Sequence, residues 1–140
     1  MLKQLLFGGE SGLSPLANAG LTLLRIFAGV ALALSHGIGK LPPSEQFIAG
    51  TANIGFPAPT VFAWAAALSE FLGGAFLALG LFTRLSSFFI AVTMLVALVG
   101  VHLNDPFGKK ELAFLYLFIA LCFLLKGAGD WSLDSIWRKK

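Results

Sequence analysis

"LRIFAGVALALSHGIGK", residues 24–40, is apolar enough to lie within a lipid bilayer, yet it carries Arg25, His36 and Lys40. A charged side chain at the centre of a membrane helix costs about 2.5–3.5 kcal/mol, so charged residues in membrane helices face the bundle interior and find partners there. The stretch therefore predicts a membrane helix that packs in a bundle and turns a polar stripe toward its neighbours.

The composition of the whole chain also indicates a membrane protein. Of its 140 residues, 57% are hydrophobic and 12% are charged, and the mean hydropathy is +0.85; soluble domains have about 25% charged residues. The length accommodates about four helices of roughly 20 residues and no separate soluble domain. We therefore predict an all-α integral membrane four-helix bundle, with a single transmembrane domain over residues 1–140.

Charge and cysteine usage exclude two classes of function. The net charge is +3, but the Lys and Arg residues are scattered at the ends of the apolar runs and form no basic stripe, so no nucleic-acid partner is expected. Cys122 is the single cysteine, which excludes dithiol exchange within the chain. We interpret Cys122 as a small buried apolar residue.

Four apolar runs predict the membrane helices, because backbone polar groups in lipid must be satisfied within the helix itself. The expected spans cover about residues 16–38, 60–82, 85–103 and 106–126. The last helix is expected to begin with Asp105 as its N-cap and Pro106 as its first residue.

The connections between the spans differ in length. "LFTRLSS", residues 81–87, allows only a tight hairpin, whereas the loop 40–59 is long enough for a short interfacial helix that begins at Ser44. In "KGAGDWSLDSIWRKK", residues 126–140, glycines end the fourth helix and Asp130 is expected to cap a short C-terminal helix. That helix has an apolar side beside a basic tail, which predicts that it lies on the membrane surface. The residues of the apolar side are Trp131, Leu133, Ile136 and Trp137.

The positions of Lys and Arg predict the orientation. An even number of spans places both termini and the middle hairpin on one side, where the basic residues are Lys3, Arg84, Lys126, Arg138, Lys139 and Lys140. The other side has Lys40, Lys109 and Lys110. The positive-inside rule therefore predicts a multi-pass protein of the cell (inner) membrane with both termini in the cytoplasm.

Two charged residues are expected to meet near the middle of the bilayer. Arg25 lies about 13 Å along a helix that begins near residue 16, and Glu70 lies at a similar depth in the next, antiparallel helix. Small residues beside Glu70 allow the two backbones to approach. These residues are Ala63, Ala66, Ala67, Gly73 and Gly74. We predict an Arg25–Glu70 ion pair, either as a purely structural link between helices or as part of a ligand or proton site.

A polar stripe on the first helix extends this hypothesis. His36 follows Arg25 by eleven residues, which is within about 20° of three full turns, and Lys40 follows His36 by four. His102 and Glu111 are expected at a similar depth to Lys40. The sequence therefore predicts a polar cavity with an outer mouth of His36, Lys40, His102 and Glu111 and a floor of Glu70 and Arg25.

Each of these residues also has a structural interpretation. A histidine at the end of a span often bonds a carbonyl or faces headgroups. Two histidines on different helices permit a bis-histidine haem, but two residues at ordinary positions do not predict one. The sequence lacks HExxH, Glu-x-x-His and cysteine ligand patterns, so no metal site is expected. Tyr116 is interpreted as a lipid or core contact.

Three segments resemble the DoxX family of small four-helix membrane proteins. They are "LRIFAGVALALSHGIGKL" (24–41), "GFPAPTVFAWAAALSEFLGGAFLALGLFTR" (55–84) and "GAGDWSLD" (127–134). The resemblance covers most of the chain and implies the four-helix fold. It also implies a link to oxidoreductases, since members related to the DoxD subunit take part in thiosulfate:quinone oxidoreductase. The residues that match recurring family positions are Arg25, His36, Lys40, Glu70 and Glu111.

The leading functional hypothesis is a membrane subunit of a quinone-linked oxidoreductase. His36 and Lys40 would donate hydrogen bonds to the quinone carbonyls, Glu70 would accept a proton, and Arg25 would be its electrostatic partner. No intrinsic cofactor motif is evident, so a redox partner protein is implied. The rival hypothesis is a non-enzymatic transporter, binding protein or assembly factor for a small polar ligand or client. The sequence is also compatible with a homo-oligomer.

Overall fold

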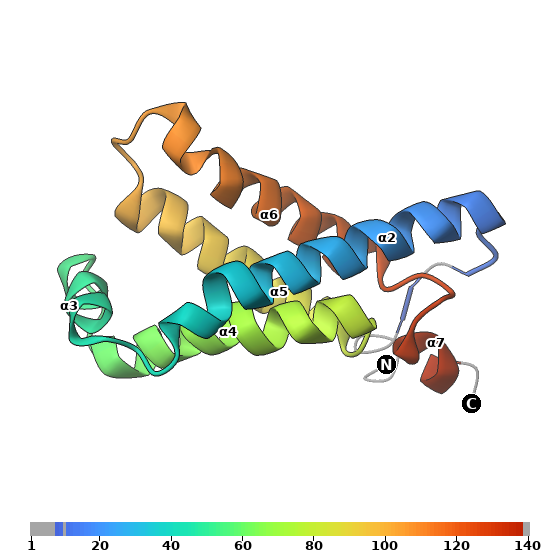
Figure 1. Ribbon diagram of the computed structural model, residues 1–140, viewed down its shortest axis with the longest axis horizontal. Coiled ribbons are helices and arrows are strands. Elements are labelled where there is room, and N and C mark those ends of the chain that lie inside the picture. The colour runs from blue at the N-terminus through green and yellow to red at the C-terminus, as the bar shows by residue number, and fades with distance from the viewer. Residues whose placement is uncertain (1–7, 10, 139–140) are drawn as a thin grey trace.

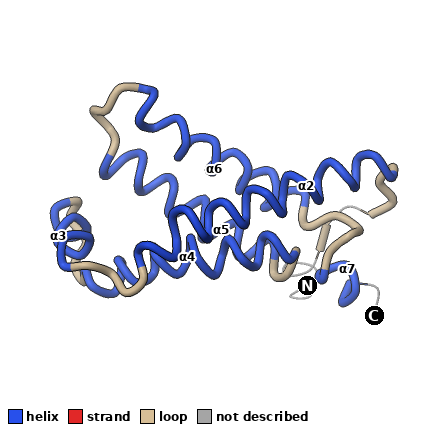
Figure 2. Tube along the Cα trace, viewed as in Figure 1, coloured by secondary structure: helices blue, strands red, loops and turns tan. Residues whose placement is uncertain are grey.

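The computed structural model describes residues 8, 9 and 11–138, and all regular secondary structure within them is helical (Figure 2). The α-helices are α2 (Pro15–Leu32), α3 (Glu45–Asn53), α4 (Pro59–Leu79), α5 (Thr83–Val96), α6 (Phe107–Lys126) and α7 (Leu133–Arg138). Shorter turns extend two of them: the π-helical η1 (Ala33–Gly37) and 3₁₀-helical η2 (Ile38–Lys40) follow α2, and the π-helical η3 (Ala97–Val101) follows α5.

Three helical segments are long and apolar enough to cross a membrane, namely Pro15–Lys40, Pro59–Leu79 and Thr83–Val101. α6 has 20 residues, or about 30 Å of helix, but three charged residues lie near its start, so its crossing of the bilayer stays a prediction. The predicted all-α membrane bundle is confirmed.

The long helices pack in the order α2, α4, α5, α6. Figure 1 shows α3 and the α5–α6 connection at one end of the bundle, which we call the α3 end, and α7 at the opposite end, which we call the α7 end. The core between the helices is formed by Ala28, Leu32, Leu77, Ile90, Ala91, Met94, Tyr116, Ala120 and Phe123.

Glycines fix the register between α2 and α4. A Cβ atom at Gly29 would lie 2.5 Å from the carbonyl oxygen of Gly74 and 2.6 Å from the nitrogen of Ala78. A Cβ at Gly37 would lie 2.5 Å from the Cα of Phe71. Because no side chain fits at either position, the two backbones touch, as small-residue crossings of membrane helices allow. Glu70 therefore lies level with Gly37 at the end of α2's extension.

This register contradicts the predicted Arg25–Glu70 ion pair. Arg25 precedes Gly37 by twelve residues, about 18 Å along the helix, and it lies instead at the C-terminal end of α4. Its Nη1 donates to the carbonyl of Leu77 at 3.3 Å and its Nη2 to the carbonyl of Trp131 at 2.9 Å. Arg25 is 2% exposed. The Arg25 guanidinium thus donates a hydrogen bond to the Leu77 carbonyl, at the C-terminal and therefore negative end of the α4 dipole.

Asp134 completes the arrangement around Arg25. Its carboxylate accepts hydrogen bonds from the backbone nitrogens of Phe82 (2.7 Å) and Thr83 (2.9 Å), at the start of α5. Its own nitrogen donates to the carbonyl of Gly80 at 2.8 Å. A Cβ at Gly80, where φ is +66°, would collide with the Arg25 guanidinium, so the tight hairpin predicted between α4 and α5 requires glycine here.

Asp130 ties the two ends of the chain together. Its carboxylate accepts from Asn18 at 3.1 Å and from Arg138 at 2.9 Å, and its nitrogen donates to the Asn18 side chain. The Asn18 hydrogen bond is the main reason that the pKa of Asp130 lies below its ordinary value. The prediction that Asp130 caps the C-terminal helix is wrong, because Ser132 instead accepts from the nitrogen of Ser135.

The chain at the α3 end follows two of the sequence predictions. The helix predicted to begin at Ser44 is present as α3, and the Ser44 hydroxyl accepts from the nitrogen of Phe47. The cap predicted for α6 is shifted by one residue, since Pro106 is the N-cap and Asp105 bonds elsewhere. Cys122 is exposed on α6, not buried as its apolar surroundings in the sequence predicted.

We expect Gly29→Ala to lower the free energy of unfolding by about 1–3 kcal/mol, the usual cost of overpacking. The added methyl group has no room between α2 and α4. Unfolding of the purified protein by SDS in mixed micelles, followed by circular dichroism, measures this change. Gly20→Ala in the same helix is the matched control, because a Cβ at Gly20 meets nothing within 4 Å. Equal losses in both variants would contradict the proposed register.

Asp134→Ala is expected to cost about 1–3 kcal/mol, because it leaves two backbone donors and the buried Arg25 without their acceptor and counter-charge. Hydrogen exchange should rise at residues 80–84 and 131–138. Asp105→Ala is the control: Asp105 is one-third exposed and bonds His102 alone among the described contacts, so its change should stay within about 0.5 kcal/mol. Unchanged exchange in Asp134→Ala would refute the role assigned to Asp134.

Candidate functional site

The candidate site is centred on an ion pair between Lys40 and Glu70. The Nζ atom of Lys40 lies 2.7 Å from Oε1 and 2.6 Å from Oε2 of Glu70, so both carboxylate oxygens accept from one ammonium group. The Glu70 side chain is 4% exposed and that of Lys40 is 36% exposed. The acid is therefore enclosed in the bundle, and the base lies between it and the surface.

The chain brings these two residues together by two local devices. α2 continues through the π-helical η1 and the 3₁₀ turn η2, at whose last residue Lys40 stands. The backbone contact of Gly37 with Phe71 holds this extension against α4 beside Glu70. Single π-helical turns occur frequently at functional sites. The partner that Glu70 needs in an apolar environment is thus supplied by Lys40 and not by Arg25.

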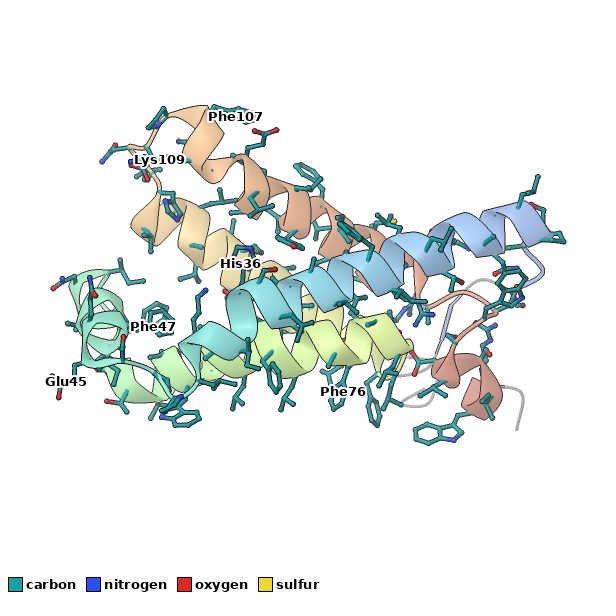
Figure 3. The ribbon with its side chains drawn as sticks, viewed as in Figure 1. His36, Glu45, Phe47, Phe76, Phe107 and Lys109 are labelled. Atoms are coloured by element: carbon teal, nitrogen blue, oxygen red, sulfur yellow. The ribbon has the colours of Figure 1, made fainter. Side chains whose placement is uncertain are left out.

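His36 and Tyr116 add two further polar groups to the site. The two rings meet edge to face, with centroids 5.8 Å apart and an interplanar angle of 74°. Tyr116 comes from α6, is 8% exposed and lies within electrostatic range of the Glu70 carboxylate. In Figure 3 the His36 side chain projects from η1 toward α5 and α6. Groups from η1, η2, α4 and α6 therefore converge at one level.

α3 covers the Lys40 side of the site. The Lys40 ammonium lies 5.6 Å from the centre of the Phe47 ring, a distance at which a cation is attracted to an aromatic face. Figure 3 shows Phe47 on the side of α3 that faces the bundle, and Glu45 on the opposite side. We call the group of His36, Lys40, Glu70, Tyr116 and Phe47 the Lys40–Glu70 cluster.

The other predicted site residues lie outside this cluster. Arg25 is at the α7 end. His102 bonds Asp105 at 2.8 Å in the α5–α6 connection, where both side chains are 34% exposed. This hydrogen bond is the main cause that lowers the pKa of Asp105 from its ordinary value. Glu111 is exposed on α6. Within the described residues, no contact joins Arg25, His102 or Glu111 to Glu70.

A pocket of about 290 Å³ lies elsewhere, between α4 and α5. Its lining is almost entirely apolar and does not include the residues of the Lys40–Glu70 cluster. Residues that line it include Leu72, Gly73, Phe76, Phe82, Ser86 and Phe89. This pocket is therefore not the polar cavity predicted from the sequence. Among the residues that the structure describes, no three His, Cys, Asp or Glu side chains gather as metal ligands do.

The interpretation of Tyr116 as a lipid or core contact is confirmed, because its ring is buried in the core, but sequence reasoning missed its contact with His36 and the contact of Phe47 with Lys40. Tyr116 is the single tyrosine of the chain and stands in a run of Phe and Leu, which was a usable signal, because a buried hydroxyl in such a run needs a polar neighbour. Phe47 gave no signal of its own, since its role depends on where α3 folds.

The cluster combines the groups that acid–base chemistry requires. It holds a carboxylate, an ammonium group, an imidazole and a phenol, with Glu70 and Tyr116 removed from water. Low dielectric strengthens hydrogen bonds from such groups to a ligand. The arrangement can therefore hold an oxygen-bearing ligand by hydrogen bonds and move protons to or from it.

Comparison with known proteins places the chain in a family. The DoxX family model matches residues 20–103. The chain is 32% identical to a Bacillus subtilis (strain 168) protein named "Putative oxidoreductase CatD" over 116 aligned residues. This alignment covers 82% of this chain and 84% of the Bacillus protein. The chain is 34% identical to a Haemophilus influenzae protein named "Uncharacterized protein" over 128 aligned residues, which cover 86% of this chain and 92% of the Haemophilus protein. No solved structure matches.

The match includes both partners of the Lys40–Glu70 pair and the glycines of the α2–α4 crossing, Gly29, Gly37 and Gly74, whereas Tyr116 lies beyond its end. The family model thus describes the helices that supply the Lys40–Glu70 pair, and this membrane protein belongs to the DoxX family.

Proposed function

We propose that the protein is the membrane subunit of an oxidoreductase and that it binds a quinone at the Lys40–Glu70 cluster. The observation that carries this proposal is the enclosed Glu70 carboxylate, held at 2.6 and 2.7 Å by a partly exposed Lys40. The name of the Bacillus subtilis relative, "Putative oxidoreductase CatD", supports the reaction class. The quinone itself is inferred from the chemistry of the cluster.

A quinone carbonyl accepts hydrogen bonds, and reduction makes its oxygens more basic. In the proposed site Lys40 and His36 donate to the carbonyl oxygens, and the Tyr116 hydroxyl provides a further donor on the α6 side. Glu70 is the proton carrier: protonated, it gives its proton to a reduced oxygen, and ionised, it accepts one from a quinol. Lys40 takes the electrostatic role that the sequence had suggested for Arg25, because it stabilises the ionised Glu70.

The overall step is two-electron reduction of the quinone to the quinol with uptake of two protons. The two electrons come from a partner protein that carries a redox centre, such as a flavin or an iron–sulfur cluster, since this chain has a single cysteine and no flavin motif. The bundle provides the binding site and the protons. The distribution of Lys and Arg favours an orientation in the inner membrane with both termini in the cytoplasm. In that orientation the α3 end and the cluster would face the outer side of the membrane.

Two substitutions test the assigned roles. We expect Glu70→Gln to slow quinol formation about 100-fold, the usual loss when a general acid–base group is removed. Lys40→Met removes a charged donor and should weaken quinone binding about tenfold or more. Quinol formation is measured in membranes that contain the native partner. Binding of menadione or decylubiquinone is measured on purified protein in nanodiscs.

The matched controls are Glu45→Gln and Lys109→Met, which change exposed residues outside the cluster. Both should behave as the unmodified protein does. The proposal is wrong if the unmodified protein binds neither quinone, or if Glu70→Gln and Lys40→Met match their controls in both measurements. Flux of a polar solute across liposomes, lost in Glu70→Gln, would instead favour the transport hypothesis.

A further inference from the structure

α3 partly covers the Lys40–Glu70 cluster, because its Phe47 ring lies beside the Lys40 ammonium group. Two other sides of Glu70 are filled by protein, because η1 touches α4 at Gly37 and Phe71 without room for a side chain, and because Tyr116 of α6 is buried in the core. Lys40 is the exposed member of the pair, and Phe47 of α3 lies over its ammonium group. The α3 side, where Lys40 is partly exposed, is therefore the approach to Glu70 that the structure favours.

α3 is attached more loosely than the long helices. It packs on α4 and has one buried residue, Thr51. Its far side is open to the surroundings, and the exposed residues there are Glu45, Gln46, Ala49, Gly50, Ala52 and Asn53. A short helix with few buried contacts opens at lower free energy than the core of the fold.

One specific contact joins the end of α3 to η3, the extension of α5. Ile54, directly after α3, lies against Gly100 in the π-helical η3. A Cβ at Gly100 would be 3.2 Å from Cδ1 and 3.3 Å from Cβ of Ile54. The absence of a side chain at Gly100 thus provides the space into which Ile54 fits. This contact and the Phe47–Lys40 contact lie on the same short segment, so both are lost when that segment moves.

We propose that α3 is the movable cover of the Lys40–Glu70 cluster, and that the ligand enters between α3 and η3 when Ile54 leaves Gly100. Opening takes the Phe47 ring off Lys40 and frees the ammonium group to bind the ligand. The entry route depends on the contacts of α3 alone. The identity of the ligand as a quinone rests on the function proposed above.

A designed disulfide tests the movement. In a Cys122→Ser background, Ile54→Cys combined with Gly100→Cys places the two Cβ atoms about 3.3 Å apart, a few tenths of an ångström short of the usual separation in disulfides. Oxidation with copper phenanthroline locks α3 onto η3, and reduction with dithiothreitol releases it. Each single-cysteine variant, treated in the same way, controls for the reagents.

The first measurement does not depend on quinone. Dicyclohexylcarbodiimide is an apolar reagent that modifies carboxyl groups, and mass spectrometry of the peptides gives the rate for each residue. We expect the oxidised double-cysteine protein to label Glu70 at least tenfold more slowly than the reduced protein. Labelling of Glu111, which is exposed on α6, should not change. The second measurement is the association rate of decylubiquinone, which should fall by a similar factor.

A second pair of variants covers the case in which the disulfide does not form. Ile54→Ala removes the side chain that closes α3 and should raise the rate of Glu70 labelling severalfold. The matched control is Ile136→Ala, an isoleucine that is 51% exposed on α7, where the rate should stay unchanged.

The outcomes separate this proposal from the proposed function. If Glu70 labels equally fast in the oxidised and reduced proteins and in Ile54→Ala, α3 is not the cover, whatever the ligand. If labelling follows the state of α3 but no variant binds quinone, the cover stands and the quinone assignment is wrong. If both rates fall together on oxidation and recover on reduction, both proposals are supported.

Discussion

The backbone contact between α2 and α4 decides which charged residues meet. Gly29 and Gly37 leave no space for side chains against α4, so the two helices can pair in one register only. In that register Glu70 faces the end of α2's extension and Lys40, while Arg25 faces the C-terminal carbonyls of α4. A shift of one turn would leave both buried charges without partners, at a cost of several kcal/mol. The electrostatics therefore follow from the steric contact and also reinforce it.

Much of the fold could be predicted from the sequence because local signals were strong. The apolar runs gave the helices, Ser44 gave the start of α3, and Gly127 marked the end of α6. The Arg25–Glu70 pair was wrong although α2 and α4 begin within one residue of the predicted positions. The stagger between the two helices is set by the backbone contacts at Gly29 and Gly37, which the helix ends do not reveal. Asp130 was assigned as a local cap because its true partner, Asn18, is 112 residues away. Long-range partners of this kind leave no trace in a single sequence.

The two ends of the bundle use buried polar groups differently. At the α7 end, the groups around Arg25 and Asp134 are mainly backbone donors and acceptors at helix ends, and the result is a fixed joint between the C-terminal segment and the α4–α5 hairpin. At the α3 end, the polar groups are ionisable side chains, and the short helix α3 lies beside them. The hydrogen bonds of the α7 end thus join secondary-structure elements, whereas the α3 end carries the groups suited to acid–base chemistry.

The hydrogen bonds of Arg25 go to the main chain of Leu77 and Trp131, not to their side chains. Any residue at those two positions offers the same carbonyl oxygen. Relatives can therefore exchange the side chains there without disturbing the joint, and pairwise covariation across the family would carry no record of these two contacts. Among the described residues, Asp134 is the one acid placed beside the Arg25 guanidinium. Joint replacement of Arg25 and Asp134 is therefore the sequence change that would reveal the loss of this joint in a relative.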